Sequence, residues 1–224
     1  MIRNLRERSP SLRRQPLPRS LGDHAPLPGK SRNVIEWREG EAVAIAFDIE
    51  RESRRLDARK PYMELIEGIE VRKMSPIFTH GSLQGKLFTI VDAWSAGRGG
   101  VATEWRCWLN TGEEKPTSLV PDVAYVSAAR WEGLDKDERE RPPFAPDLAI
   151  EIRSPGDRER NVQRKIALYL QHGSRVVLDV RPKQRVIVSY DGSAPVTLAC
   201  GDTFAQAAFA GLRIDVAALF AAIG

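Results

Sequence analysis

Three side chains in the second half of the chain could act together: the carboxylates of Asp122 and Glu151 and the ammonium group of Lys165. Asp122 opens the apolar run Val-Ala-Tyr-Val, and Glu151 interrupts a second run, Leu-Ala-Ile-Glu-Ile. A carboxylate inside a buried strand is costly to desolvate unless a cation meets it. Two such strands with a lysine close behind therefore indicate a divalent metal and phosphodiester chemistry.

The two carboxylates can converge if their strands are neighbours in one sheet. Carboxylates held close together raise each other's pKa and are best relieved by a hard cation such as Mg²⁺ or Mn²⁺. Such an ion can generate a hydroxide nucleophile and neutralise charge on a phosphate. We therefore predict Asp122 and Glu151 as metal ligands, and we interpret Asp147, which shares a strand face with Glu151, as a strand-entry residue.

Lys165 lies eight residues after Asp157, which we predict as the N-cap of a helix. Helical side chains lean towards the N-terminus, so a lysine two turns into the helix can reach back over the edge of the sheet. There it could orient water or stabilise a phosphate in the transition state. The same spacing also fits a solvated helix lysine, and the residues alone leave both interpretations open.

Four further polar residues are candidate neighbours of the site: Glu64, His80, Gln84 and Arg153. His80 starts a predicted helix and Gln84 follows one turn later on the same face, although a lone histidine there also fits a cap or a surface position. Glu64 lies in a predicted hairpin strand, where it also fits an outward-facing charge. Arg153 lies in an arginine-rich stretch and could contact phosphates.

The hydrophobic pattern predicts the elements that must position these residues. Strands are predicted at 63–66, 69–74, 101–109, 119–126, 148–152, 176–180 and 185–190, and helices at 80–96 and 157–172. The first two strands form a hairpin around Glu67 and Gly68. This order of strands and helices predicts an α/β or α+β domain with a mixed central sheet.

The charge of the chain is unevenly distributed. Residues 1–33 combine eight basic side chains with two acidic ones, so the net charge of +4 comes from this segment and the remainder carries −2. We predict 1–33 as a disordered Arg/Pro-rich tail, 34–60 as a poorly defined segment with a strand at 43–49 and a charged helix or linker at 50–60, and 61–224 as the domain. The basic balance is therefore no evidence for nucleic-acid binding by the domain.

Several classes of protein are not expected. No apolar stretch approaches the roughly 20 residues needed to span a bilayer, and no secretory signal is recognised. Cys107 and Cys200 lack motif spacing and are interpreted as buried thiols of a cytosolic protein. His24, His80 and His172 are far apart, so a zinc site is not expected. We expect a cytoplasmic protein with no membrane partner.

Several segments together resemble the Uma-two family, a group of restriction-endonuclease-like proteins in the PD-(D/E)xK nuclease superfamily. In the family's order they are YMELIEGIEVRKMSP, HGSLQGKL, SLVPDVAYVS, APDLAIEIRSPGD, KIALYLQHGSRVVLDVRP and FAGLRIDVAALF, over about residues 61–220. The resemblance implies a restriction endonuclease-like mixed sheet flanked by helices and a metal-dependent nuclease site. By motif position, Asp122 matches the metal-binding Asp, Glu151 its acidic partner, and Lys165 the lysine displaced onto the following helix.

The chain departs from the superfamily pattern at Arg153, where Glu-x-Lys would have a lysine. Arginine cannot lose a proton at neutral pH, so the lysine role falls to Lys165 or is absent. The leading hypothesis is a Mg²⁺- or Mn²⁺-dependent endonuclease acting on DNA, with Asp122, Glu151 and Lys165 as catalytic residues. The alternative is a catalytically inactive nuclease-fold protein that serves as a nucleic-acid-binding or regulatory module. A homodimer is a further expectation, because cleavage of both strands often needs two sites.

Overall fold

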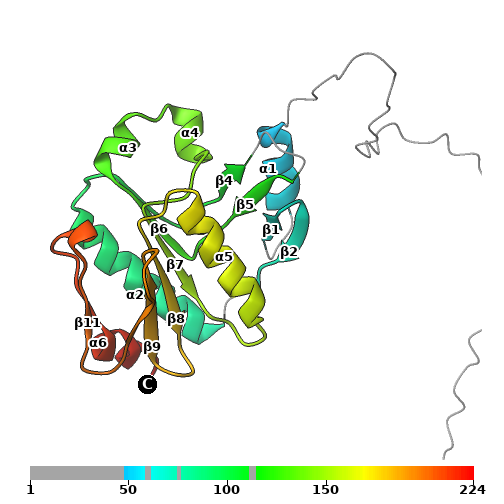
Figure 1. Cartoon of the computed structure of the whole chain (residues 1–224). Helices are drawn as coiled ribbons and strands as arrows, with labels where there is room; N and C mark the ends of the chain where they lie inside the picture. Colours follow the sequence, from blue (N-terminus) through cyan, green and yellow to red (C-terminus); the bar gives the residue numbers. More distant parts are fainter. Residues whose placement is uncertain (1–47, 59–61, 75–76, 111–114) are drawn as a thin grey trace, which may run out of the picture. The chain divides into compact units, whose positions relative to one another are not determined.

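The candidate residues come from segments in or next to two β-sheets and from the helices packed against them. Figure 1 shows how these sheets and helices are arranged. A computed structural model describes residues 48–58, 62–74, 77–110 and 115–224 of the chain. All of these residues fall within one compact unit, Ile45–Gly224. The predicted disordered tail lies outside the described residues.

The larger described sheet has six strands in the order β10-β9-β8-β7-β6-β3. Its strands are β3 (Gly100–Thr103), β6 (Val123–Val126), β7 (Leu148–Ile152), β8 (Val176–Arg181), β9 (Val186–Tyr190) and β10 (Val196–Leu198). The pair β7/β8 is parallel and the other pairs are antiparallel, so the sheet is mixed. The predicted α/β (α+β) class with a mixed central sheet is confirmed.

A smaller, antiparallel sheet has the order β2-β1-β5-β4. Its strands are β1 (Met63–Ile66), β2 (Ile69–Arg72), β4 (Cys107–Asn110) and β5 (Thr117–Leu119). The predicted hairpin is confirmed as β1/β2, with positive φ angles at Glu67 (50°) and Gly68 (79°) in its turn. A two-stranded sheet near the C-terminus pairs β11 (Thr203–Phe204) with β12 (Ile214–Asp215).

The prediction of one strand over 101–109 is wrong. The chain leaves β3 at Glu104, whose φ of 53° is incompatible with an extended strand, and re-enters a strand only in β4. β3 belongs to the six-stranded sheet and β4 to the four-stranded sheet. The break therefore lets one short segment connect the two sheets.

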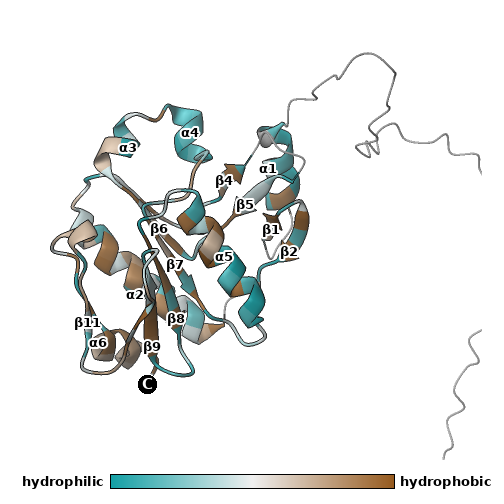
Figure 2. Ribbon diagram, viewed as in Figure 1, coloured by the Kyte–Doolittle hydropathy of each residue, from teal (hydrophilic) through white to brown (hydrophobic). Residues whose placement is uncertain are grey.

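Two long helices cover opposite faces of the six-stranded sheet. Helix α2 (Phe78–Ser95) buries Leu83, Leu87 and Val91, spaced four residues apart, against one face. Helix α5 (Glu159–Gln171) packs on the other face together with residues of the smaller sheet. Figure 2 shows β8 and β9 as largely apolar between these layers, whereas α4 is hydrophilic.

The shorter helical elements complete the described chain: α1 (Ile49–Asp57), α3 (Ala128–Glu132), α4 (Lys136–Glu140), α6 (Val216–Phe220) and the 3₁₀ turns Ala207–Phe209 and Ala221–Ile223. Helix α1 contacts the smaller sheet, where Trp108 Nε1 donates a hydrogen bond of 2.9 Å to Ser53 Oγ. None of the helices in the described ranges combines the length and the apolar character needed to cross a membrane.

The structure bears on the N-terminal predictions only in part. Helix α1 agrees with the helix option for 50–60. The strand expected at 43–49 lies outside the described residues apart from Asp48 and Ile49, which are the N-cap and first residue of α1. The division of the chain after residues 33 and 60 stays a prediction.

Alternation along β7 determines which side chains meet α5. Leu148, Ile150 and Ile152 join the core beneath α2, whereas Ala149 joins the core beneath α5. Successive side chains of a strand point to opposite faces, so Glu151 is directed with Ala149 towards α5. The carboxylate therefore faces the helix that carries the candidate lysine.

Two local predictions need correction. The N-cap position of helix α5 is held by Arg158, without a side-chain capping hydrogen bond, rather than by Asp157, whose carboxylate instead accepts a 2.7 Å hydrogen bond from the Ser154 amide and closes the preceding loop. Of the two cysteines, Cys107 is buried as expected, but Cys200 is exposed. Burial raises the pKa of the Cys107 thiol to about 12 and leaves it protonated at neutral pH.

Candidate active site

Asp122 and Glu151 meet at one edge of the six-stranded sheet. Asp122 directly precedes β6, Glu151 lies near the end of β7, and the two strands pair antiparallel. The Asp122 carboxylate also accepts a 2.6 Å hydrogen bond from the Ile152 amide through Oδ2. Both side chains are buried, with 1% of Asp122 and 8% of Glu151 exposed. The structure thus brings together the two carboxylates that the sequence singled out.

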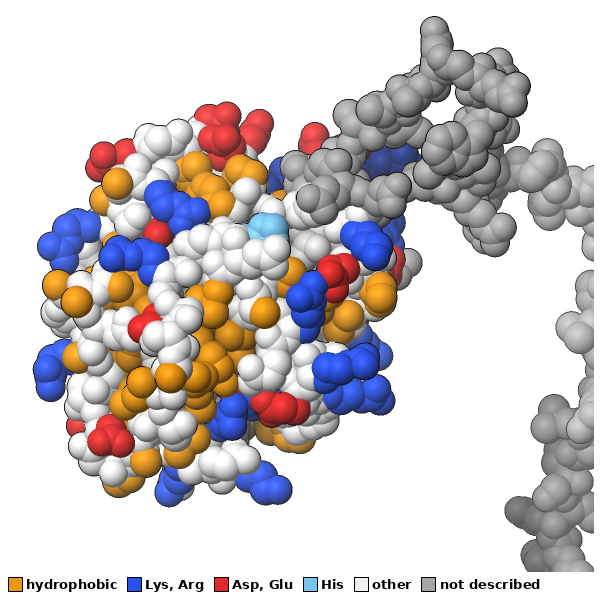
Figure 3. Space-filling model, viewed as in Figure 1, with side chains coloured by type: hydrophobic (Ala, Val, Ile, Leu, Met, Phe, Trp, Pro, Cys, Tyr) orange, Lys and Arg blue, Asp and Glu red, His pale blue; other side chains and the backbone are white. Residues whose placement is uncertain are grey.

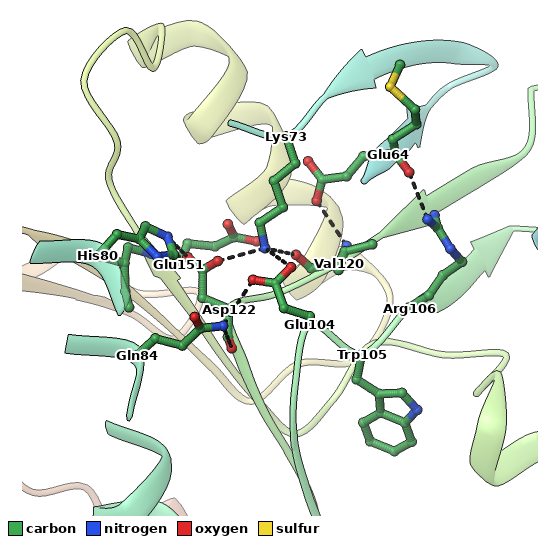
Figure 4. A network of polar contacts seen from close by, with 12 residues as sticks. Glu64, Lys73, His80, Gln84, Glu104, Trp105, Arg106, Val120, Asp122 and Glu151 are labelled. Carbon is green, nitrogen blue, oxygen red and sulfur yellow. Dashed lines mark hydrogen bonds and ion pairs between the residues drawn. The ribbon is translucent and has the colours of Figure 1, made fainter. Parts of the chain in front are cut away.

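Lys73, which the sequence analysis did not identify, supplies the cation next to Asp122 (Figure 4). It follows β2, and its Nζ atom lies 2.6 Å from Asp122 Oδ1 and 3.0 Å from Glu104 Oε2. The same ammonium donates a 2.7 Å hydrogen bond to the Val120 carbonyl. Only 12% of the Lys73 side chain is exposed, so this ion pair is shielded from solvent.

Glu104 and Gln84 extend the network around Asp122. Gln84 Nε2, on α2, donates 3.0 Å hydrogen bonds both to Glu104 Oε1 and to the Asp122 carbonyl. Figure 4 shows Glu104, Gln84 and Lys73 converging on Asp122 from different elements. Gln84 is therefore a neighbour of the site, as predicted, and Glu104 is a further acidic member that the sequence analysis missed.

His80 lies one turn before Gln84 on α2 and reaches the other carboxylate oxygen. Its Nε2 atom is 3.2 Å from Asp122 Oδ2, and 5% of the residue is exposed. Burial lowers the pKa of His80, but the hydrogen bond and the charge of Asp122 outweigh it, so that the pKa is raised overall. His80 Nδ1 has no hydrogen-bond partner within the described ranges. The histidine is therefore buried against Asp122 rather than at the surface.

Lys165 and Glu64 complete the site around Glu151. Lys165 Nζ lies 2.7 Å from Glu151 Oε2 and 2.9 Å from Glu64 Oε1. Tyr169, one turn further along α5, donates a 2.7 Å hydrogen bond to Glu151 Oε1, and the Val120 amide donates a 2.9 Å hydrogen bond to Glu64. Lys165 is only 9% exposed. The solvated-lysine alternative is wrong, and Glu64 points inward rather than outward.

The pKa values of the two central carboxylates are shifted in opposite directions. Burial raises the pKa of Asp122, but the charge of Lys73 and the contact with His80 outweigh it and hold that pKa well below its usual range. Burial raises the pKa of Glu151 to about 7, with Glu64 and Asp122 acting in the same direction against Lys165. Asp122 is therefore a permanent anion, whereas Glu151 can exchange a proton near neutral pH.

Arg153 does not contact the two central carboxylates. Its guanidinium forms hydrogen bonds of 2.6 and 2.7 Å with Asp179 and also binds Glu159. Asp147, at the opposite end of β7, accepts a 2.8 Å hydrogen bond from the Ser127 amide and pairs with Arg130. Asp147 is therefore structural, as interpreted, and Arg153 anchors the loop after β7 rather than replacing the lysine of the superfamily pattern.

The site opens into a cleft of about 170 Å³. Its lining includes Asp122, Glu151, Lys73 and Lys165 at the base, and the exposed Arg72 and Arg158. The face shown in Figure 3 carries basic and acidic side chains interspersed around an apolar area. Positive groups that could meet a phosphate thus line the same cleft as the carboxylates.

A mixed sheet with helices on both faces, carrying buried carboxylates and lysines at one edge, places the protein among those with a nuclease fold. The chain belongs to the Uma2 family, whose sequence model, described as "Putative restriction endonuclease", matches residues 50–217. This membership confirms the resemblance seen in the sequence and supports a nuclease function. Among curated proteins, none matches the chain.

A solved structure supports the same fold. The chain is similar to the protein described as "a putative nuclease belonging to DUF820 from Anabaena variabilis ATCC 29413", with 22% sequence identity and a TM-score of 0.66. The alignment covers 73% of this chain and 92% of the other. At this level of identity the likeness shows the fold alone.

Proposed function

We propose that the protein is a metal-dependent endonuclease that hydrolyses DNA phosphodiester bonds. The observation that carries the proposal is the pair of buried carboxylates, Asp122 and Glu151, held on adjacent strands at the base of a cleft with Lys165 2.7 Å from Glu151. In this proposal Asp122 and Glu151 bind the metal and Lys165 is the catalytic lysine. A cytoplasmic location and a homodimer, which would bring two sites to a duplex, belong to the same proposal.

The donor chemistry of the site fits Mg²⁺ or Mn²⁺. Carboxylate oxygens are the ligands these ions prefer, and the carboxylates of Asp122 and Glu151 line the same cleft. Within the described ranges no group of three or more His, Cys, Asp or Glu side chains is placed to hold a metal ion. Asp122 and Glu151 would therefore share the ion with waters, as Mg²⁺ sites commonly do. When bound, the ion would activate a water and neutralise phosphate charge.

The side chains of this site divide the remaining work. Lys165, held between Glu151 and Glu64, keeps an ammonium group beside the position that a phosphate would occupy in the cleft. His80 fixes the orientation of the Asp122 carboxylate, and Tyr169 fixes that of Glu151. A bound cation would lower the pKa of Glu151 and keep it ionised.

One observation favours the alternative, a catalytically inactive nucleic-acid-binding or regulatory module. The ammonium groups of Lys73 and Lys165 already pair with Asp122 and Glu151, so each of these two carboxylates has a cation beside it without a metal. Both hypotheses use the same strands and helices. They differ in whether the carboxylates bind a cation and whether DNA is cut.

Metal titration separates the two hypotheses. Calorimetric titration of Mn²⁺ into the wild type, Asp122→Asn and Glu151→Gln should show binding in the wild type that each variant loses. Asp137→Asn, which changes an exposed carboxylate on α4, is the matched control and should bind like the wild type. If the site variants bind Mn²⁺ as the wild type does, the assignment of the ligands is wrong.

Cleavage tests the catalytic step. Plasmid and single-stranded DNA incubated with the protein and Mg²⁺ or Mn²⁺ should be cut by the wild type and by Asp137→Asn, but not by the two site variants. Metal binding without cleavage would favour the inactive module. Cleavage that survives the loss of both carboxylates would place the activity elsewhere.

A further inference from the structure

Lys73 lies beside Asp122, the residue proposed above as a metal ligand. The ammonium lies 2.6 Å from Asp122 Oδ1, and only 12% of the side chain is exposed. The other carboxylate oxygen, Oδ2, is already engaged by the Ile152 amide at 2.6 Å and by His80 at 3.2 Å. Oδ1 is therefore the oxygen left for a metal ion, and the Lys73 ammonium is in contact with it.

A divalent ion and the Lys73 ammonium cannot share this oxygen at low cost. Two positive charges within a few Å of each other in a shielded site repel strongly. The Lys73 contact at 2.6 Å is a charge-assisted ion pair, so a metal ion that binds at Oδ1 must replace it. Its remaining partners, Glu104 Oε2 at 3.0 Å and the Val120 carbonyl at 2.7 Å, could retain the ammonium after it moves off Asp122.

The two lysines of the site are about equally buried, with 12% and 11% of their side chains exposed, but their acidic partners differ, since Glu104 beside Lys73 is 25% exposed. Lys165 lies on α5 between two carboxylates, both of which are almost fully buried. Lys73 follows the edge strand β2, and its backbone amide is fixed by a 2.9 Å hydrogen bond to the Tyr62 carbonyl. Its flexible four-carbon stem can therefore swing while the backbone stays in place, and it lines the open cleft.

We propose that Lys73 is the built-in counter-cation of Asp122, which a divalent metal ion must displace in order to bind. The proposal rests on the proposed function, because it assumes that Asp122 is a metal ligand. Lys73 thus keeps the buried carboxylate compensated without metal and sets the metal affinity. Once displaced, the Lys73 ammonium remains in the cleft, where it can donate a hydrogen bond to a phosphate group.

The first test compares Mn²⁺ affinity in the wild type and Lys73→Met by calorimetric titration. Methionine keeps the apolar stem but removes the competing charge, so we expect Lys73→Met to bind Mn²⁺ at least ~10-fold more tightly, a gain of about 1.4 kcal/mol. The matched control is Lys86→Met, an exposed lysine on α2, which should leave the affinity unchanged. Equal or weaker binding by Lys73→Met overturns the proposal.

The second test uses the unaltered protein and so does not depend on the folding of a variant. Acetylation of each lysine is followed by mass spectrometry with and without Mn²⁺. Lys73 should react slowly in the metal-free protein and several-fold faster when Mn²⁺ is bound, whereas Lys165 should stay protected in both states. If Lys73 reactivity does not change, or falls, on metal binding, the proposal is overturned.

The outcomes also separate this proposal from the proposed function. Mn²⁺ binding that is lost in Asp122→Asn but unchanged in Lys73→Met would overturn the role of Lys73 and leave the metal site in place. No Mn²⁺ binding by either the wild type or Lys73→Met would overturn both the counter-cation role and the metal-dependent mechanism.

Discussion

Replacing Lys165 by methionine tests the buried charge cluster on which the site depends. Methionine keeps the apolar stem but removes the ammonium that lies 2.7 Å from Glu151 and 2.9 Å from Glu64. Those carboxylates are only 8% and 3% exposed, so Lys165→Met leaves them buried beside each other without a cation. Removing one partner of a buried ion pair typically costs about 3–5 kcal/mol. We expect a loss of this size in the free energy of unfolding at pH 8.

The loss should depend on pH because Glu151 titrates near neutrality. Burial raises the pKa of Glu151 from 4.5 to about 7 in spite of Lys165, a shift worth about 3 kcal/mol. Without Lys165 the folded-state pKa rises further. The pKa of Glu151 in the folded protein then exceeds its value in the unfolded chain by a larger margin. The folded state therefore binds the proton more tightly, and the free energy of unfolding falls as the pH rises above 4.5. The cost of Lys165→Met should therefore shrink to no more than about half at pH 5.

Urea unfolding in EDTA, at pH 5 and at pH 8, measures both effects. Lys136→Met, which changes an exposed lysine on α4, should unfold like the wild type at both pH values. The double variant Lys165→Met/Glu151→Gln removes the charge that loses its partner and should recover much of the stability at pH 8. A cost below about 1 kcal/mol at pH 8, or an equal cost at both pH values, would refute the reasoning from buried charge.

Two further predictions concern the scaffold and its surface. Leu87→Ala removes a fully buried side chain of α2 from the central core and should cost about 2–5 kcal/mol in urea unfolding, whereas a cost near zero would contradict the packing described. The hydrogen bond from Arg153 lowers the pKa of Glu159 to about 2, so its contribution is present above pH 4.5 and is lost as pH falls towards 2. Because the Glu159 side chain is 62% exposed, Glu159→Gln should cost no more than about 1 kcal/mol at pH 7, and this difference should shrink between pH 5 and pH 3 in urea unfolding.

The apolar runs of the central strands were predictable because these strands are covered on both faces, although the single strand predicted over 119–126 is wrong: Leu119 ends β5 in the four-stranded sheet and Val123 begins β6 in the six-stranded sheet. β6 and β7 read as nearly continuous apolar runs, and a charge inside or at the start of such a run stands out. That contrast is why Asp122 and Glu151 could be identified from the sequence. The antiparallel pairing of their strands could not be read locally, yet it is what brings the start of one and the end of the other to the same edge.

The buried position of Lys165 could have been predicted from the sequence, although its spacing from Asp157 alone fits two interpretations. The buried face of α5 includes Val162, Ile166 and Tyr169, spaced three to four residues apart. Lys165 falls three residues after Val162 and so lies on this buried stripe. A lysine on the apolar face of a helix needs a buried anion, and Glu151 was the anion already proposed. Helical periodicity could therefore have excluded the solvated position.

No sequence pattern of this kind marks Lys73, because its contacts form only where the two sheets meet in the folded chain. It follows an edge strand whose side chains are mostly exposed, a setting in which a lysine is usually solvated. Its partners Asp122, Glu104 and Val120 lie 31 to 49 residues further along the chain. No local pattern connects residues at such distances, so the cation beside Asp122 appears only once the chain is folded.

The wrong prediction of a single strand over 101–109 and the failure to identify Glu104 have the same cause, the break in the chain at Glu104. A non-glycine residue held at a φ of 53° costs on the order of 1–3 kcal/mol and persists only where its surroundings fix it. Here Gln84 and Lys73 hold the Glu104 carboxylate by contacts of 3.0 Å each. The break that ends β3 also directs the Glu104 carboxylate to the Lys73 ammonium. In a continuous strand, Glu104 would instead have stayed in the hydrogen-bonded pairing of the sheet. The local rule for strand formation therefore fails at a residue whose side chain contacts both Lys73 and Gln84.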